Sequence, residues 1–217
     1  MFPNNWCKWT PVALSADVPA GTVIPAWTPT GDVALWRSQS GQLSASSDRC
    51  PHRGMRLSHG FVRGEALACI YHGWSYGRDG ACLRIPAHPD LQPPASINTR
   101  NQITTEREGI VWVVNEAQDE PPPSFDGYWP LRSMTFQASI AALEAAAGAK
   151  ADISGLIRCT LGGETAFLLA VTKGEAETIV HVLADKNASL AQRIAISQAG
   201  EQLRRDAESA DALEGAN

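Results

Sequence analysis

Two short segments, each pairing one cysteine with one histidine, constrain this chain more than any other feature of its sequence. The first is the segment 50–54 (CPHRG) and the second is the segment 69–74 (CIYHGW). Sixteen residues separate His52 from Cys69, so the whole pattern is C-x-H-x16-C-x2-H. Thiolate sulfur and imidazole nitrogen both bind metals. We therefore expect the N-terminal part of the chain to fold around a metal centre.

The mixture of ligand types in each segment predicts the kind of centre. Thiolates and imidazoles suit the iron of iron–sulfur clusters. Cys50 and Cys69 can bind one iron while His52 and His72 bind the other, which is the arrangement of a Rieske-type [2Fe-2S] cluster. Neutral imidazoles in place of two thiolates remove negative charge, which raises the reduction potential relative to an all-cysteine cluster. The predicted cofactor and metal ligands are therefore Cys50, His52, Cys69 and His72, and no catalytic residue is assigned.

A structural zinc site is the alternative for the same four residues. Zinc also accepts two thiolates and two imidazoles, but its usual spacings pair like with like, as C-x2-4-C and H-x3-5-H. Here each segment mixes the two types. Gly54 and Gly73 follow the ligand pairs, where glycine permits a tight turn that brings backbone N–H groups near sulfur. The spacing and these flanking residues favour the iron–sulfur cluster.

The composition is that of an ordinary globular chain and excludes several classes of partner. The 217 residues, 44% hydrophobic and 19% charged, suit one large or two small domains. A net charge of −5 without a basic run makes nucleic acid and anionic membranes poor partners. The sequence has no apolar run of about 18 residues and no visible signal peptide at its start, so we expect a cytoplasmic protein. Five cysteines, an odd and sparse set, argue against a disulfide framework.

Short apolar runs separated by turn signals predict a β-rich domain over residues 1–120. Three consecutive prolines at 121–123 predict a Pro-rich linker over 121–135, followed by a small α+β domain over 136–217. The turn Asp79-Gly80 predicts a hairpin. Expected N-terminal strands include the segments 66–71, 74–76, 82–85 and 109–114. In the C-terminal domain we expect a helix at 140–147, strands at 153–160, 165–172 and 178–183, and a long helix from about 190 to 210.

Residues 1 to about 118 resemble the N-terminal Rieske domain of Rieske non-haem iron oxygenases, especially the vanillate-demethylase-like α subunits. The resemblance implies an antiparallel β-sandwich with a small cluster-binding subdomain. Met55 and Ile70 stand where respiratory Rieske proteins carry an extra pair of cysteines, so it also implies a low potential of roughly −150 mV. The matching segments are 2–6, 48–54, 57–58 with Gly60, 69–74, 80–86 and 109–113.

The family also implies a second metal site that this sequence lacks the residues to build. Complete oxygenase α subunits hold a mononuclear iron on two histidines and one carboxylate. The chain has five histidines, and only His181 lies beyond the prolines. We therefore expect no mononuclear iron site in this stretch of chain. The C-terminal region resembles the last part of the family's helix-grip domain, and the alternative is an unrelated small α+β domain for docking or oligomerisation.

Several further residues have a structural interpretation beside a functional one. We expect His181 to pack within a strand, His59 to lie on the surface, and Arg53 either to position the cluster loop or a partner carboxylate or to be a plain surface residue. Tyr71, Trp74 and Tyr76 could shield the cluster or line an electron path, and the alternative is simple core packing. The remaining expectations are small buried thiols at Cys7, Cys82 and Cys159 and a solvated helix face at Glu201, Asp206 and Glu208.

Two functions fit these predictions. In the first, the chain is an electron-transfer protein that receives single electrons from a flavin or iron–sulfur reductase and passes them to a separate oxygenase subunit. In the second, it is a shortened oxygenase-like subunit within a hetero-oligomer, because in the family the electron crosses from one protomer to its neighbour. The resemblance thus implies an oligomer, trimer-based or hetero-oligomeric. A redox sensor or assembly factor is a third possibility.

Overall fold

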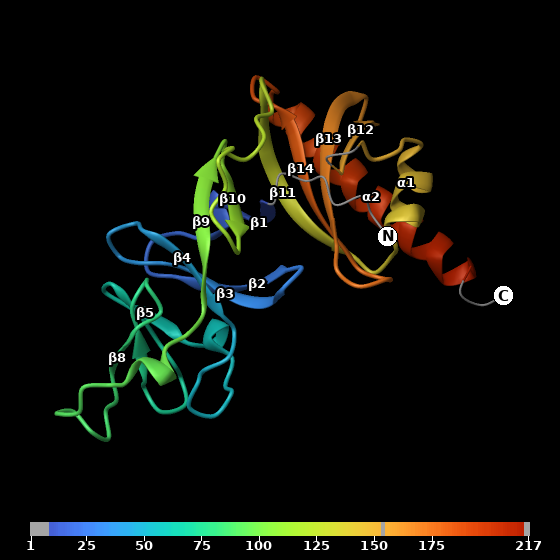
Figure 1. The fold of residues 1–217 in the computed structure, drawn as a ribbon. Helices are drawn as coiled ribbons and strands as arrows, with labels where there is room; N and C mark the ends of the chain where they lie inside the picture. Colours follow the sequence, from blue (N-terminus) through green and yellow to red (C-terminus); the bar gives the residue numbers. More distant parts are fainter. Residues whose placement is uncertain (1–8, 153–154, 215–217) are drawn as a thin grey trace. The chain divides into compact units, whose positions relative to one another are not determined.

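The computed structural model describes residues 9–152 and 155–214, and these residues form two compact units (Figure 1). We call residues 15–106 and 111–119 the N-terminal unit, and the described parts of 9–14, 107–110 and 120–214 the C-terminal unit. Among the described helices, none is both long enough and apolar enough to cross a membrane. Cys7 lies outside the described residues.

The N-terminal unit contains two antiparallel sheets, as expected for the sandwich and its small cluster-binding subdomain. From the larger sheet this unit contains five strands in the order β10-β9-β4-β3-β2, and the smaller sheet has the order β5-β6-β7-β8. The strands of the larger sheet are β2 (Val23–Thr28), β3 (Gly31–Arg37), β4 (Leu43–Ser47), β9 (Asn101–Arg107) and β10 (Ile110–Val114). Those of the smaller sheet are β5 (Phe61–Arg63), β6 (Ala66–Ala68), β7 (Ser75–Tyr76) and β8 (Cys82–Arg84).

Local sequence explains most of these strands. Strand β10 agrees with the strand expected at 109–114, and every residue of it is buried, so both of its faces are covered. The hairpin between β7 and β8 closes at Asp79-Gly80, where the Asp79 carboxylate accepts a hydrogen bond from the Ala81 N–H at 3.0 Å. The strand expected at 66–71 is shorter than predicted. It ends at Ala68 because the chain turns into the loop that begins at Cys69.

The C-terminal unit is a four-stranded antiparallel sheet with two helices, which confirms the expected α+β region (Figure 1). The strand order is β11-β14-β13-β12. The strands are β11 (Tyr128–Phe136), β12 (Leu156–Leu161), β13 (Glu164–Thr172) and β14 (Thr178–Asp185), the helices are α1 (Ile140–Ala147) and α2 (Leu190–Glu214), and the short strand β1 (Thr10–Leu14) also belongs to this unit.

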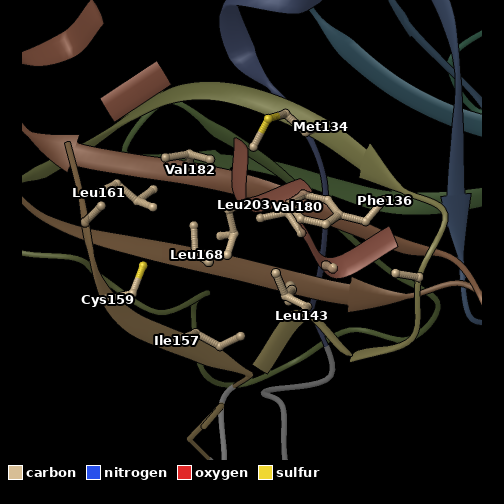
Figure 2. Close-up of a cluster of buried hydrophobic side chains, with 14 of the residues drawn as sticks. Met134, Phe136, Leu143, Ile157, Cys159, Leu161, Leu168, Val180, Val182 and Leu203 are labelled. Atoms are coloured by element: carbon tan, nitrogen blue, oxygen red, sulfur yellow. The ribbon is translucent and has the colours of Figure 1, made fainter. Parts of the chain in front are cut away.

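One apolar core joins the helices to a face of this sheet (Figure 2). Leu143 of α1 and Leu203 of α2 pack with side chains from all four strands of the sheet. Phe136 and Leu168 are fully buried there. Burial of apolar side chains is the main favourable term in folding, so this core is what holds the C-terminal unit together. The other labelled members in Figure 2 are Met134, Ile157, Cys159, Leu161, Val180 and Val182.

Strand β11 begins at Tyr128 and so overlaps the segment 121–135, for which we predicted a Pro-rich linker. Pro130 lies within it, and proline cannot donate a ladder hydrogen bond. The strand tolerates Pro130 because it is at the edge of the sheet and because its register shifts between Pro130 and Arg132. The domain limits 1–120 and 136–217 stay a proposal.

Candidate metal centre

The first loop, residues 50–55, is closed by its own backbone. The Cys50 N–H donates to the Met55 carbonyl at 2.8 Å, and the Gly54 N–H donates to the Cys50 carbonyl at 2.8 Å. Gly54 has a φ of 69°, a left-handed conformation that a side chain disfavours. The Arg49 guanidinium donates to the Gly54 carbonyl at 3.1 Å. The loop therefore holds Cys50 and His52 on a tight turn.

The second loop, residues 69–74, repeats this pattern. The Cys69 N–H donates to the Trp74 carbonyl at 2.8 Å, and the Gly73 N–H donates to the Cys69 carbonyl at 3.0 Å. Gly73 has a φ of 71°, and a Cβ there would come within 3.1 Å of the Pro86 Cγ. Each loop thus has cysteine first and glycine fifth, whereas the histidine is third in one and fourth in the other.

The two loops bring the predicted ligands together as two pairs of like residues. Cys50 and Cys69 are both buried, and their thiols interact directly. The rings of His52 and His72 lie with centroids 4.6 Å apart at an interplanar angle of 64°. In the described part of the chain no three or more His, Cys, Asp or Glu side chains are arranged around one ion. A thiol pair beside an imidazole pair is what a cluster of two irons requires.

The protonation of these side chains fits metal binding. Burial raises the pKa of the Cys69 thiol, although the backbone N–H groups of Tyr71 and His72 act in the opposite direction. A buried thiolate therefore needs a nearby positive charge, and a bound metal ion supplies it by deprotonating the thiol outright. Partial desolvation lowers the pKa of His52, and His72 and Arg53 lower it further. This favours the neutral imidazole, the form that binds a metal.

An aromatic ring lies against each histidine. The indole of Trp74 stacks on His52 with centroids 4.4 Å apart and an interplanar angle of 3°. The ring of Tyr71 lies 3.9 Å from that of His72 at an angle of 36°. His52 is half-buried, whereas His72 and Tyr71 are exposed. Trp74 and Tyr71 therefore both contact predicted ligands, and this contact agrees equally with a role at the cluster and with simple packing.

Tyr76 contacts the sulfur side of the site. Its hydroxyl lies 3.2 Å from the Cys50 Sγ, and its ring is fully buried. Burial and the neighbouring thiols raise the pKa of Tyr76, so the hydroxyl stays protonated. A metal-bound thiolate can only accept a hydrogen bond, and the Tyr76 hydroxyl would donate to it. Cys82 belongs to the same buried apolar cluster as Cys50 and Tyr76, but it lies in β8 and in neither loop.

Asp48 is a supporting residue that sequence reasoning did not single out. Its carboxylate, 1% exposed, accepts from the Ser58 N–H at 2.6 Å and from the Ser58 hydroxyl at 2.8 Å. Arg56 pairs with Asp48 at 3.4 Å and with Asp32 at 3.1 Å. These contacts tie the chain before the first loop to the chain after it. The only sequence signal was the Asp two residues before Cys50.

The remaining candidates lie away from the loops. His59 is exposed, as predicted. His181 is 1% exposed in β14, and its Nδ1 lies 2.8 Å from the Ser133 hydroxyl, which agrees with a packed residue. Burial lowers the pKa of His181 to about 4. Glu201, Asp206 and Glu208 of α2 are partly or fully exposed, as predicted. Arg204 pairs with Glu201 and Glu208 at 2.6 Å each.

One family model matches the part of the chain that carries this site. Residues 8–98 match the family model described as "Rieske [2Fe-2S] domain", and the match includes both loops. The chain contains a Rieske [2Fe-2S] domain. The Rieske domain implies the Rieske-type cluster as its cofactor, which confirms the cofactor predicted from the sequence.

Curated relatives of the chain are larger proteins. "Oxidoreductase NdmD" of Pseudomonas putida is 30% identical over 174 residues, which cover 79% of this chain and 29% of that protein. "Toluene-4-sulfonate monooxygenase system iron-sulfur subunit TsaM1" of Comamonas testosteroni is 29% identical over 129 residues, 59% of this chain and 37% of that protein. The chain thus spans well under two thirds of either relative.

Solved structures share the fold beyond the Rieske domain. The apo form of dicamba monooxygenase matches with a TM-score of 0.72 and 19% identity, over 96% of this chain and 88% of that chain. Pseudomonas putida CBB5 NdmA matches with a TM-score of 0.63 and 18% identity, over 93% of this chain and 79% of that chain. With such coverage, most of the C-terminal unit also has a counterpart in these proteins.

Proposed function

We propose that this chain is a one-electron carrier of a Rieske oxygenase system, with Cys50 and Cys69 on one iron and His52 and His72 on the other. The observation that carries the proposal is the pair of matching loops, which set two thiols and two imidazoles side by side within a Rieske domain. When bound, the [2Fe-2S] cluster supplies reversible one-electron chemistry. A flavin or iron–sulfur reductase is the proposed donor, and an oxygenase subunit with a mononuclear iron is the proposed acceptor.

The protein residues around the site have separate roles in this proposal. The Tyr76 hydroxyl, 3.2 Å from the Cys50 Sγ, would donate a hydrogen bond to the metal-bound thiolate. Trp74 stacks on the ring of His52, and the loop glycines permit the tight turns of both loops. Buried Cys50 and Cys69 exclude water from the sulfur side. None of the four described cysteines forms a disulfide, which supports the proposed cytoplasmic location, where thiols stay reduced.

The C-terminal unit supports a role without substrate chemistry in this stretch of chain. The one histidine beyond residue 120, His181, is buried and bonded to Ser133. Metal sites that activate oxygen in this family type use two histidines and a carboxylate with open positions. We therefore assign the C-terminal unit a structural role and no second iron site. The electron acceptor in this proposal is an iron held outside this stretch of chain.

The test begins with anaerobically purified protein. We expect about two irons and two sulfides per chain, and a Rieske-type EPR signal after reduction by one electron. A colourless protein that contains zinc, or no metal, would contradict the proposal. Reductase and chain without an oxygenase subunit should consume reductant only until the cluster is reduced, so steady turnover of a substrate would also contradict it.

A second candidate function is a shortened oxygenase-like subunit in a hetero-oligomer. The fold match favours it, because dicamba monooxygenase aligns with 96% of this chain and so shares the C-terminal unit as well as the Rieske domain. Sedimentation velocity of the purified chain, alone and with an oxygenase α subunit, separates the two. A monomer that forms no stable complex supports the free carrier, and a stable mixed oligomer supports the subunit.

A further inference from the structure

The outer surface of the two loops combines exposed apolar and cationic side chains. Ile70 and Tyr71 are 54% and 57% exposed and adjoin His72 in the second loop. Arg49, which immediately precedes the first loop, and Arg53, within it, are also exposed. We call these four residues, Arg49, Arg53, Ile70 and Tyr71, the loop rim. Single exposed apolar side chains are common, but the rim places two of them beside a predicted iron ligand, with the Tyr71 ring 3.9 Å from that of His72.

The charge of the loop rim is opposite in sign to that of the whole chain. The sequence has no acidic residue in the segments 49–56 and 69–74, although its net charge is −5. Asp48, which adjoins the first loop, is buried and engaged by Ser58 and Arg56. No ion pair found in the described residues uses Arg49 or Arg53. Their charges are therefore available to a partner.

We propose that the loop rim docks an acidic redox protein, one whose own one-electron centre lies beneath a surface rich in Asp and Glu. This proposal rests on the proposed function, since it assumes that electrons enter the chain at His52 and His72. In the encounter the donor is oxidised by one electron and the chain's iron–sulfur group is reduced by one, with no bond formed or broken. The charges of Arg49 and Arg53 steer the approach, and Ile70 and Tyr71 give a water-excluding contact.

The small size of the loop rim suits a transient contact. Weak redox encounters bury less surface than stable complexes, and Tyr and Arg are enriched at the centres of interfaces. Tyr71 would contact the bound donor beside the exposed His72, so its ring offers a route from the donor to an iron ligand. A second copy of this chain, itself acidic overall, is the competing occupant, and the test below separates it from a foreign donor.

The experiment uses the full, cluster-loaded chain and stopped-flow reduction by a reduced plant-type [2Fe-2S] ferredoxin, an acidic protein, as the probe. The double variant Arg49→Gln/Arg53→Gln should slow the second-order rate about tenfold at about 0.01 M ionic strength, and the difference should shrink at about 0.15 M. Tyr71→Ser should slow the rate at both salt concentrations. Arg78→Gln, at an exposed arginine beyond the other end of β7, is the matched control and should change the rate less than twofold.

Three outcomes overturn the proposal in distinguishable ways. A chain that binds no cluster, judged by iron content and EPR before any kinetics, overturns the proposed function together with the rim. An intact cluster with the same ferredoxin rate in the wild type and the double variant overturns the loop rim alone. The third outcome is a wild type that sediments as an oligomer and a double variant that is slower in the kinetics and sediments as a monomer. In that case the loop rim binds a second copy of this chain, and the proposal of a foreign donor is wrong.

Discussion

The N-terminal and C-terminal units solve different physical problems. The N-terminal unit places its reactive side chains on two short loops and fixes them by backbone hydrogen bonds, such as those that Gly54 and Gly73 donate. The C-terminal unit gathers apolar side chains between a sheet and two helices and buries its one histidine as a neutral group. The comparison indicates that metal chemistry depends on loop geometry in one unit, whereas stability depends on packing in the other.

The largest expected effect removes a cluster ligand. Cys50→Ser should abolish the cluster, because one iron loses half of its protein ligands, and iron content should fall from about two per chain to near zero. Cys82→Ala is the matched control, since Cys82 is an equally buried thiol of the same apolar cluster that we do not assign as a ligand. Loss of the cluster in the control and its retention in Cys50→Ser would reverse the assignment.

A core substitution tests whether the C-terminal unit acts as a scaffold. Leu168→Ala, at a fully buried position, should lower the free energy of unfolding by about 3 kcal/mol through lost burial and a residual cavity. The EPR signal and potential of the native variant should not change. Urea denaturation followed by circular dichroism measures the effect, with the exposed Leu83→Ala as control. A shifted potential would show that the units are not separable in this way.

Low pH should lower the free energy of unfolding through protonation of His181. Burial lowers its folded pKa to about 4, against about 6.5 when unfolded, so the unfolded state binds the proton first. The stabilisation is complete above pH 6.5 and is lost as the pH falls from 6.5 towards 4, which amounts to about 2 kcal/mol at pH 5 relative to pH 7. Urea titrations at both pH values measure it. His181→Gln should remove this difference, and an unchanged difference would assign it to other groups.

The two loop glycines give a matched pair of smaller effects. Gly54→Ala and Gly73→Ala both force alanine into a left-handed conformation at a cost of about 1 kcal/mol. Gly73→Ala should cost more, because its Cβ would also meet the Pro86 Cγ, whereas the Cβ at Gly54 meets nothing within 4 Å. Melting temperatures of the two variants test the order. Equal destabilisation would show that Pro86 moves aside freely.

The smallest effect concerns the potential. Tyr76→Phe removes the hydrogen bond to the Cys50 Sγ. The bond is stronger to the more electron-rich reduced cluster, so its loss should lower the potential, by roughly 40 mV if the bond strength changes by about 1 kcal/mol between redox states. Redox titration monitored by EPR measures the shift. A potential that stays the same or rises would show that the hydroxyl does not donate to this sulfur.

Local patterns in the sequence were sufficient for some elements of the fold. The helix predicted at 140–147 agrees with α1, because Ser139 caps its start by accepting from the Ala142 N–H and Gly148 ends it with a φ of 63°. Strand β11 could not be found this way. Pro130 argues against a strand unless the position is known to be at a sheet edge, and that depends on pairing with β14, about 50 residues further along the chain.

In the metal centre, too, some residues could be predicted from local sequence and others could not. The residues of the two loops could be named from spacing and ligand chemistry alone, because the loops are local. Their supports could not, because they come from tertiary register. Tyr76 reaches Cys50 across 26 residues, and the stacking of Trp74 on His52 joins one loop to the other. The role of Asp48 could not be predicted either, because it depends on the folded chain bringing Ser58 back to the Asp48 carboxylate.

The histidine stands one position later in the second loop than in the first, and the two predicted histidine ligands differ in their exposure to solvent. His52, third in its loop, is half-buried beneath Trp74, and His72, fourth in its loop, is open to solvent beside Tyr71. With both imidazoles on one iron as proposed, their nitrogens are inequivalent, and nitrogen hyperfine spectra should resolve two distinct couplings. Electron transfer to and from the cluster would then favour the exposed His72, and this preference would follow from the position of one residue in a six-residue loop.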